Sequence, residues 1–82
     1  MLDKKQYTDL DLREISRNLK AFHKQGKKIL DNVDFMNLFN IHRNTALSWR
    51  LTQKIKFSRV GRRVFYRVED VEEMMEQLRV KS

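Results

Sequence analysis

The sequence predicts a mainly α-helical domain with one small β-hairpin. Apolar residues recur every three or four positions in several stretches, as they do on one face of a helix. Near position 61, a glycine divides two short runs of alternating residues, as in a hairpin. The chain has 82 residues and neither proline nor cysteine, so we expect one domain without disulfides or thiolate metal sites.

The first predicted helix covers residues 9–25 and follows a loose tail, residues 1–6. Thr8 is a favourable N-cap residue, and Asp11 completes a capping box three positions later. Gly26 supplies the left-handed residue that commonly ends a helix. The apolar stripe of this helix consists of Leu12, Ile15, Leu19 and Phe22. It either packs on the domain's own core or forms a dimer seam, and the sequence leaves both open.

A short and very apolar helix is predicted at residues 32–39, with Asp31 as its N-cap. Its apolar residues are Val33, Phe35, Met36, Leu38 and Phe39. A helix that is apolar all round is expected to be buried. Asn40 then takes the turn, because asparagine tolerates a left-handed backbone, and Ile41 should fill the core between this helix and the next.

The next predicted helix, residues 43–52, should dock on the core through one face, with Ala46, Trp49 and Gln53 at helical spacing. His42, just before it, is interpreted as a cap or surface residue rather than a ligand, because no cluster of Cys, His or acids surrounds it. The opposite face of the helix carries Arg43, Asn44, Leu47, Ser48 and Leu51.

Two strands, residues 57–60 and 63–67, are predicted around a tight turn at Gly61-Arg62. One face of the return strand carries Val64 and Tyr66, and the other carries Arg63, Phe65 and Arg67. Because either aromatic residue could be partly buried, the sequence does not say which face looks inward. An acidic helix, residues 69–79, ends the chain and is expected to pack on the core through Val71, Met74, Met75 and Leu78.

Positive charge is concentrated in residues 40–67. The chain has a net charge of +7, and this segment holds eight Lys and Arg residues without any Asp or Glu. A run of charge is commonly just a solvated face. Here, however, apolar residues interleave with the cations, so the segment can fold and keep its cations on one side. A folded surface of one sign is what binding a polyanion requires.

The order of helix, turn, helix and hairpin resembles the winged helix-turn-helix domains of the excisionase and MerR-like group. The resemblance covers roughly residues 30–78. It is carried by N-I-x-R-x-T (Asn40, Ile41, Arg43, Thr45), R-V-G-R-R (residues 59–63) and V-E-D-V (residues 68–71). This sequence departs from the family pattern at Asn40, His42, Gln53 and Lys56, where glycine, serine, glycine and proline are common. We therefore predict a tail and a packing or dimerisation helix in residues 1–28, and a winged helix-turn-helix DNA-binding domain in residues 29–82.

The resemblance implies that helix 43–52 enters the major groove of DNA and that hairpin 57–67 contacts the backbone or the minor groove. Arginine pairs with guanine through two hydrogen bonds, asparagine pairs with adenine in the same way, and an apolar side chain can contact a thymine methyl. The predicted contact residues on the helix are Arg43, Asn44, Thr45, Leu47, Ser48 and Arg50. Those that follow it are Lys54, Lys56, Arg59, Arg62, Arg63 and Arg67.

The predicted function is sequence-specific binding of double-stranded DNA, as an excisionase-like recombination directionality factor or a small transcription regulator. Further expected partners are a recombinase or an identical subunit. We expect no cofactor, no membrane contact and a cytoplasmic location. The sequence ends too soon for the effector domain of MerR-type regulators, so no small-molecule effector is expected.

A protein-interaction or RNA-binding adaptor is the alternative, acting through the N-terminal helix and the basic surface. RNA binding would need stacking aromatics such as Phe57, Phe65 and Tyr66, for which core packing is the expected use. An enzyme is not expected, because the two histidines, His23 and His42, have no evident partners and the sequence has no glycine-rich phosphate loop.

Overall fold

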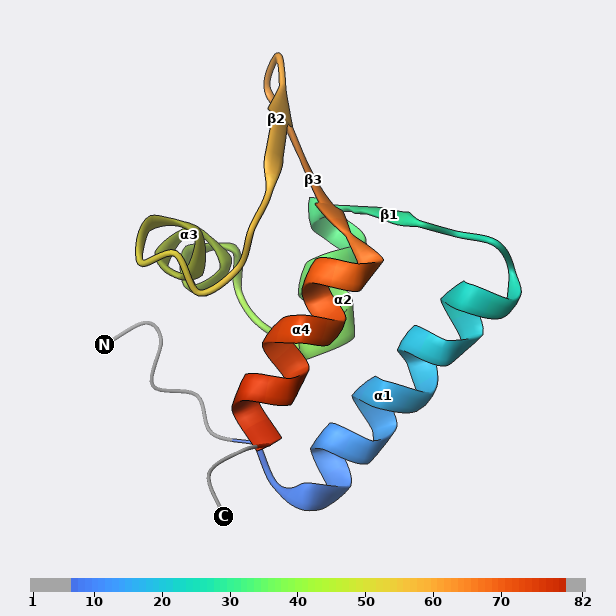
Figure 1. Ribbon diagram of the computed structural model, residues 1–82. Coiled ribbons are helices and arrows are strands. Elements are labelled where there is room, and N and C mark those ends of the chain that lie inside the picture. Colours follow the sequence, from blue (N-terminus) through green and yellow to red (C-terminus); the bar gives the residue numbers. More distant parts are fainter. Residues whose placement is uncertain (1–6, 80–82) are drawn as a thin grey trace.

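The computed structural model describes residues 7–79; the predicted tail, residues 1–6, and the end of the second predicted domain, residues 80–82, lie outside that part. In chain order the elements are α1 (Asp9–Lys24), β1 (Ile29–Asp31), α2 (Asn32–Phe39), α3 (Arg43–Leu51), β2 (Ser58–Val60), β3 (Arg63–Arg67) and α4 (Val68–Arg79). The helices surround a common core, and the hairpin of β2 and β3 projects beyond them (Figure 1). This arrangement confirms the predicted winged helix-turn-helix with an extra helix at each end.

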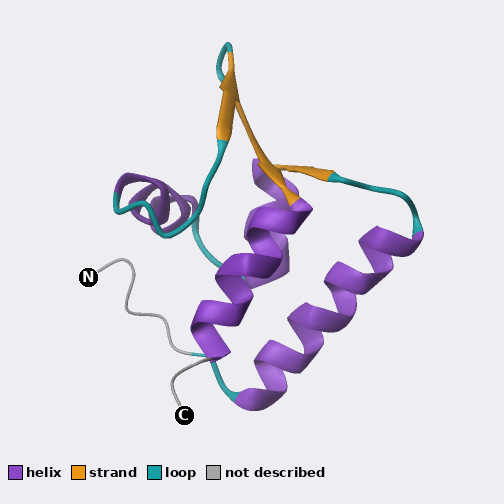
Figure 2. Cartoon of the chain, viewed as in Figure 1, coloured by secondary structure: helices purple, strands orange, loops and turns teal. Residues whose placement is uncertain are grey.

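The sheet has one strand more than the sequence predicts. Its three antiparallel strands lie in the order β1-β3-β2, and β1 lies where the sequence predicts no helix or strand. Leu30 of β1 pairs with Tyr66 of β3, and Arg59 of β2 pairs with Val64. Figure 2 shows β1 leading from α1 to the base of the hairpin. Three residues are too few to show an alternating pattern, so only their tertiary pairing reveals this strand.

A cluster of aromatic side chains holds α2, α3 and β3 together. The ring of Phe35 stacks on that of Tyr66, with 3.9 Å between centroids. Trp49 meets Phe35 and Phe39 edge-on, at 6.1 and 5.5 Å. All four side chains are buried. The positions of the third helix and of the hairpin's inner strand are therefore set by the same cluster.

Helix α1 covers the core from the other side, next to α4 (Figure 1). Its residues Leu12, Ile15 and Leu19 are buried, and Phe22 is partly buried against the same core. These side chains therefore pack on the core of their own chain, which is one of the two alternatives that the sequence leaves open. The predicted capping box is present, since Asp11 N–H donates to Thr8 Oγ1 and Thr8 N–H donates to an Asp11 carboxylate oxygen.

Helix α2 is buried on one side only, which corrects the expectation of an all-round buried helix. Phe35, Leu38 and Phe39 are buried, whereas Val33 is 58% exposed. The helix lies at the edge of the core, so the side that bears Val33 meets solvent. Composition alone does not separate these two situations for a helix of two turns.

Within residues 7–79, two residues other than glycine adopt the left-handed conformation. Asn40 has φ +54° in the turn between α2 and α3, and Gln53 has φ +63° just after α3. The resembled family often has glycine at both places, and this chain keeps the backbone conformation with a larger residue. Gln53 is exposed, so it does not join Ala46 and Trp49 on the core. The inward face of β3 is that of Val64 and Tyr66, both of which are buried.

Candidate nucleic-acid interface

Helix α3 is held by a small buried side and leaves the rest of its surface to solvent. Ala46 and Trp49 are buried, as predicted. His42 is the N-cap, one of the two roles that the sequence predicts for it: its Nδ1 accepts a hydrogen bond from Asn44 N–H at 3.2 Å. His42, Arg43 and Asn44 are all exposed, so a ligand that approaches from outside can reach this end of the helix.

Five of the six predicted contact residues on α3 point into solvent or border it. Arg43, Asn44 and Leu47 are exposed, and Thr45 and Ser48 are half-buried. No other described residue forms an ion pair with Arg43. The N-terminal half of α3 therefore presents a guanidinium, an amide, a hydroxyl and an apolar side chain on one surface.

Arg50 differs from the other predicted contact residues because it bonds inward. Its Nη1 donates to the hydroxyl oxygen of Tyr66 at 2.7 Å and to Oδ1 of Asn32 at 3.2 Å. The Tyr66 hydroxyl in turn donates to the same Asn32 oxygen at 2.8 Å. Burial raises the pKa of the Tyr66 hydroxyl, while the hydrogen bond and charge of Arg50 act to lower it. These bonds tie α3 to α2 and β3, and no spacing in the sequence predicts them.

The hairpin carries its cations on a ribbon that is largely outside the core. All three residues of β2 are exposed, as are Gly61 and Arg62 in the turn. The Arg63 guanidinium lies over the ring of Phe65, 5.8 Å from its centroid. Arg59 and Arg62 form no ion pair with any residue of the described range. The positive φ of Gly61, +61°, allows the tight turn that brings these arginines to the tip.

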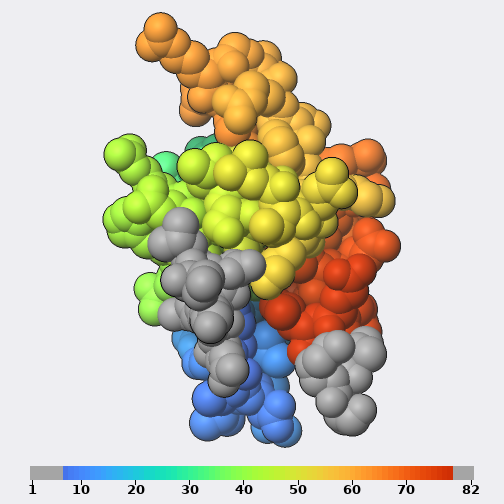
Figure 3. Space-filling view, turned by 90° about the vertical axis from the view of Figure 1, so that its left-hand side faces the viewer, coloured from blue at the N-terminus to red at the C-terminus, as the bar shows by residue number. Residues whose placement is uncertain are grey.

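Helix α3 and the hairpin lie side by side on one face of the molecule. Figure 3 shows that face, with the yellow-green atoms of α3 adjoining the orange atoms of the hairpin above it. The blue atoms of α1 lie at the other end of the same view, and the red atoms of α4 lie to one side. The structure thus brings together the two predicted contact elements.

Three further cations of the basic segment already have neighbours. Lys56 lies 3.8 Å from a carboxylate oxygen of Glu73, and Arg67 lies 3.1 Å from one of Glu69. Lys54 Nζ is 6.0 Å from the centre of the Trp49 ring. Both ion pairs are well exposed, and exposed pairs of this kind contribute at most about 1 kcal/mol. Helix α4 therefore meets the basic segment at Lys56, before β2, and at Arg67, the last residue of β3, rather than at α3 or the hairpin tip.

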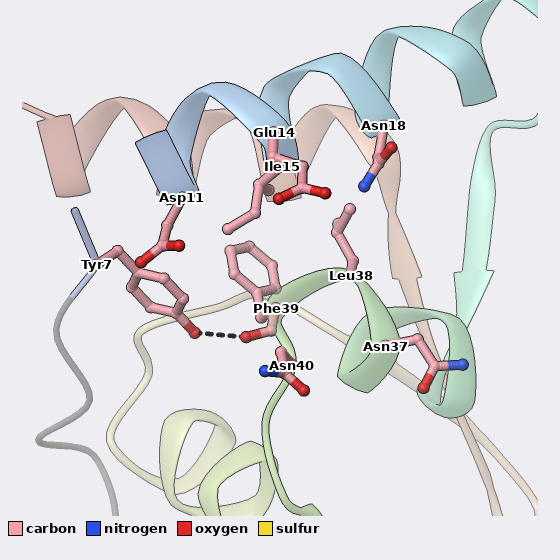
Figure 4. Close-up of a pocket in the computed structure, with 9 residues that line it drawn as sticks. All are labelled: Tyr7, Asp11, Glu14, Ile15, Asn18, Asn37, Leu38, Phe39 and Asn40. Carbon is pink, nitrogen blue, oxygen red and sulfur yellow. Dashed lines mark hydrogen bonds between the residues drawn. The ribbon is translucent and has the colours of Figure 1, made fainter. Parts of the chain in front are cut away.

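The start of α1 is tied to the turn that precedes α3. The Tyr7 hydroxyl donates to the backbone carbonyl of Phe39 at 2.9 Å, and the two rings meet edge-on with 6.0 Å between centroids. Figure 4 shows this contact at the side of a small hollow between α1 and α2, lined by polar side chains such as Asp11 and Asn18. Burial, with a smaller effect of the Asp11 carboxylate, raises the pKa of Tyr7. The contact steadies the end of α2 from outside the helix-turn-helix itself.

His23 does have a partner, contrary to the expectation from the sequence. Its Nε2 lies 2.5 Å from a carboxylate oxygen of Glu72, across the contact between α1 and α4. The two residues are 49 positions apart, so only the tertiary structure places them together.

Neither a metal-binding cluster nor a membrane-spanning helix occurs within the described residues. Among residues 7–79, no group of three or more His, Cys, Asp or Glu side chains could hold a metal ion. None of the helices in this range combines the length and the hydropathy that a membrane span requires.

One of three comparisons with known proteins found a match, and it agrees with this geometry. No curated protein and no solved structure matches the chain. The model of the helix-turn-helix domain, a family of DNA-binding domains, matches residues 29–79, which include α2, α3, the hairpin and α4. The chain therefore belongs to the helix-turn-helix domain family.

Proposed function

We propose that this chain binds double-stranded DNA in a sequence-specific way, with α3 in the major groove and the hairpin on the backbone or in the minor groove. The observation that carries the proposal is the shared face of α3 and the hairpin, on which Arg43, Arg59 and Arg62 have no ion-pair partner among the described residues. Cations without partners can release counterions from DNA at little cost to the fold. Membership of a DNA-binding domain family supports the same conclusion.

Within this function, the two groups of contact residues have different tasks. Arg43 and Asn44 are the first two residues of α3, and Ser48 lies one turn after Asn44 on the same side. Side chains in this part of a helix-turn-helix meet base edges, so these three should set sequence preference. The arginines of the hairpin tip should bind the phosphate backbone or a narrow minor groove, which adds affinity without much choice of sequence. We also propose that Lys56 and Arg67 exchange their ion pairs with Glu73 and Glu69 for contacts with DNA phosphates.

The test starts with selection of bound sites from random duplex DNA, followed by affinity measurements at several salt concentrations. If about six phosphates are contacted, log affinity should fall against log salt with a slope of about −5. Arg62→Gln should weaken binding to all duplexes to a similar extent and reduce the slope by about one. Asn44→Ala should instead flatten the preference among sequences.

Arg17→Gln is the matched control, because Arg17 is an exposed arginine of α1 and the substitution removes the same charge. It should leave sequence preference unchanged and affect affinity less than Arg62→Gln. An equal loss for both variants would mean that only net charge matters, and would contradict the proposed face. Preference for single-stranded RNA over every duplex would favour the adaptor function.

We further propose that the cellular role is that of an excisionase-like directionality factor or a small transcription regulator, with a recombinase or an identical subunit as a further partner. The two roles differ in what the protein does to its site. A directionality factor should bend the DNA, which placing the selected site at different positions in fragments of equal length would show as position-dependent gel mobility. A site that stays straight would favour the regulator.

A further inference from the structure

Two leucines stand on the solvent side of α3. Leu47 is 42% exposed and Leu51 is 73% exposed. With about 100° between successive residues of a helix, Leu51 and Asn44 differ by only about 20° in direction, and both point away from the side of Ala46 and Trp49. The most outward direction of the helix is therefore shared by an amide and an apolar side chain.

Each leucine alone would need no explanation, since single apolar residues are common on protein surfaces. Their setting is unusual. Asn44, Leu47, Ser48 and Leu51 fall within an arc of about 100° on the helix, and Arg43 borders it. Polar side chains that can contact base edges thus alternate with apolar ones along the same exposed strip.

We propose that Leu47 and Leu51 contact the 5-methyl groups of thymines in the major groove, so that the target site contains thymine at the positions they face. This inference rests on the proposed function and makes it more specific. The thymine methyl is the one apolar group on the floor of the major groove, and apolar side chains are its natural contacts. Leu47 was predicted from the sequence as a contact residue, whereas Leu51 gains this role from its exposure and direction.

The spacing of the two side chains is compatible with neighbouring base pairs. Leu47 and Leu51 are one turn apart, which is about 6 Å along the helix axis. Successive base pairs of DNA are about 3.4 Å apart. Because a helix that follows the groove runs obliquely to the DNA axis, it advances less than about 6 Å along that axis, and the two leucines face base pairs one or two steps apart.

A protein partner fits the same strip less well. The central part of a protein–protein interface is depleted of charged residues. Here Arg43 lies at one edge of the strip, and the free arginines of the hairpin share the same face. The basic segment also lacks any acid to pair with them, as residues 40–67 contain neither Asp nor Glu.

The experiment uses the best duplex from the site selection. Each thymine in turn is replaced by deoxyuridine, which keeps the base pair and the O4 acceptor and removes only the 5-methyl group. We expect about a four-fold loss of affinity at one or two positions, which corresponds to about 0.8 kcal/mol for one buried methyl group. The loss should disappear in Leu51→Ala at one position, and in Leu47→Ala at the other if two are found.

Leu10→Ala is the matched control, because Leu10 of α1 is also 73% exposed. It should keep both the affinity and the sensitivity to deoxyuridine. A selected site without thymine, or one in which no deoxyuridine matters, would overturn this inference while leaving sequence-specific binding intact. If Leu51→Ala changed self-association in sedimentation instead of the response to deoxyuridine, the strip would be a protein contact and the inference would be wrong. Failure to enrich any duplex would reject the proposed function as well.

Discussion

Helices α1 and α3 both bury an apolar side and present cations to solvent, but they differ in what lies between the cations. On α1 the exposed cations are Arg13, Arg17, Lys20 and Lys24. Their side chains fall within an arc of about 60° on the side away from the buried stripe, and no apolar or uncharged residue of α1 lies within that arc. On α3 the exposed strip combines a single guanidinium with an amide, a hydroxyl and two leucines. Charge attracts any polyanion, whereas a mixed surface can distinguish one base pair from another.

The two helices also differ in how firmly they are attached. Helix α1 has 16 residues, a complete capping box and three buried apolar residues. Helix α3 has nine residues, a histidine cap and two buried residues, of which only Trp49 is large. The helix that we propose to contact DNA is therefore the one with fewer attachments, and each attachment should matter more.

The largest effect is expected from Trp49→Ala. Loss of this buried ring should lower the free energy of unfolding by about 3–5 kcal/mol. For a domain of this size, that corresponds to a fall in Tm of more than about 12 °C, measured by circular dichroism. Trp49→Phe should cost less, because it keeps an aromatic ring and removes the buried indole N–H, which has no hydrogen-bond partner within the described residues.

Leu19→Ala on α1 and Leu51→Ala on α3 calibrate that result. Leu19 is buried, so its truncation should cost about 2–5 kcal/mol. Leu51 is exposed, so its truncation should change stability by no more than about 0.5 kcal/mol. If Trp49→Ala were as mild as Leu51→Ala, α3 would be held by contacts other than the aromatic cluster.

An intermediate effect is expected from Tyr66→Phe, which removes the hydroxyl shared by Arg50 and Asn32. Leaving these half-buried groups partly unpaired should cost about 1–3 kcal/mol. Because Arg50 is on α3, the variant should also lose DNA affinity at temperatures where it is still folded. Tyr7→Phe, just before α1, removes the hydroxyl that donates to the Phe39 carbonyl, and is the comparison at the other helix.

The same two tyrosines predict a loss of stability in alkali. Both hydroxyls have a pKa raised above 10.0 in the folded chain, chiefly by burial. The folded state therefore holds these protons more tightly than the unfolded state. This stabilisation is complete below about pH 10 and is lost as the pH rises from there toward the folded pKa values. Urea unfolding between pH 9 and about 11 should show the decline, and Tyr7→Phe with Tyr66→Phe should reduce its slope.

The smallest of these effects concerns the caps. His42→Ala removes the acceptor of Asn44 N–H and should cost about 1 kcal/mol, with His42→Ser recovering most of it. Thr8→Ala on α1 removes the Oγ1 acceptor of Asp11 N–H, keeps the backbone N–H that donates to the Asp11 carboxylate, and should cost about as much. If His42→Ala left both stability and affinity unchanged, the cap of α3 would have no measurable role.

Periodicity and turn chemistry predicted most of the fold. The ranges of α2 and β3 agree with the structure, and α1, α3, β2 and α4 differ from prediction by one residue at one end. Left-handed conformations were anticipated at Gly26, Asn40 and Gly61. These successes concern neighbouring residues, whose preferences act within a turn of helix or hairpin. The errors concern elements whose state depends on distant residues: β1 needs its partner β3, and the exposed side of α2 depends on where the core ends.

The candidate site divides in the same way. Side-chain chemistry and spacing alone determined that residues 40–67 carry the positive charge, that Ala46 and Trp49 share the buried side of α3, and that Gly61 makes a hairpin turn between arginines. Only the tertiary structure decided which cations remain free: Arg50 bonds to Asn32 and Tyr66, while Lys56 and Arg67 meet the acids of α4. Helical and hairpin patterns arise from residues close in the chain, so they can be read in order. Pairing between side chains many positions apart depends on how the elements pack, and a linear pattern does not contain that information.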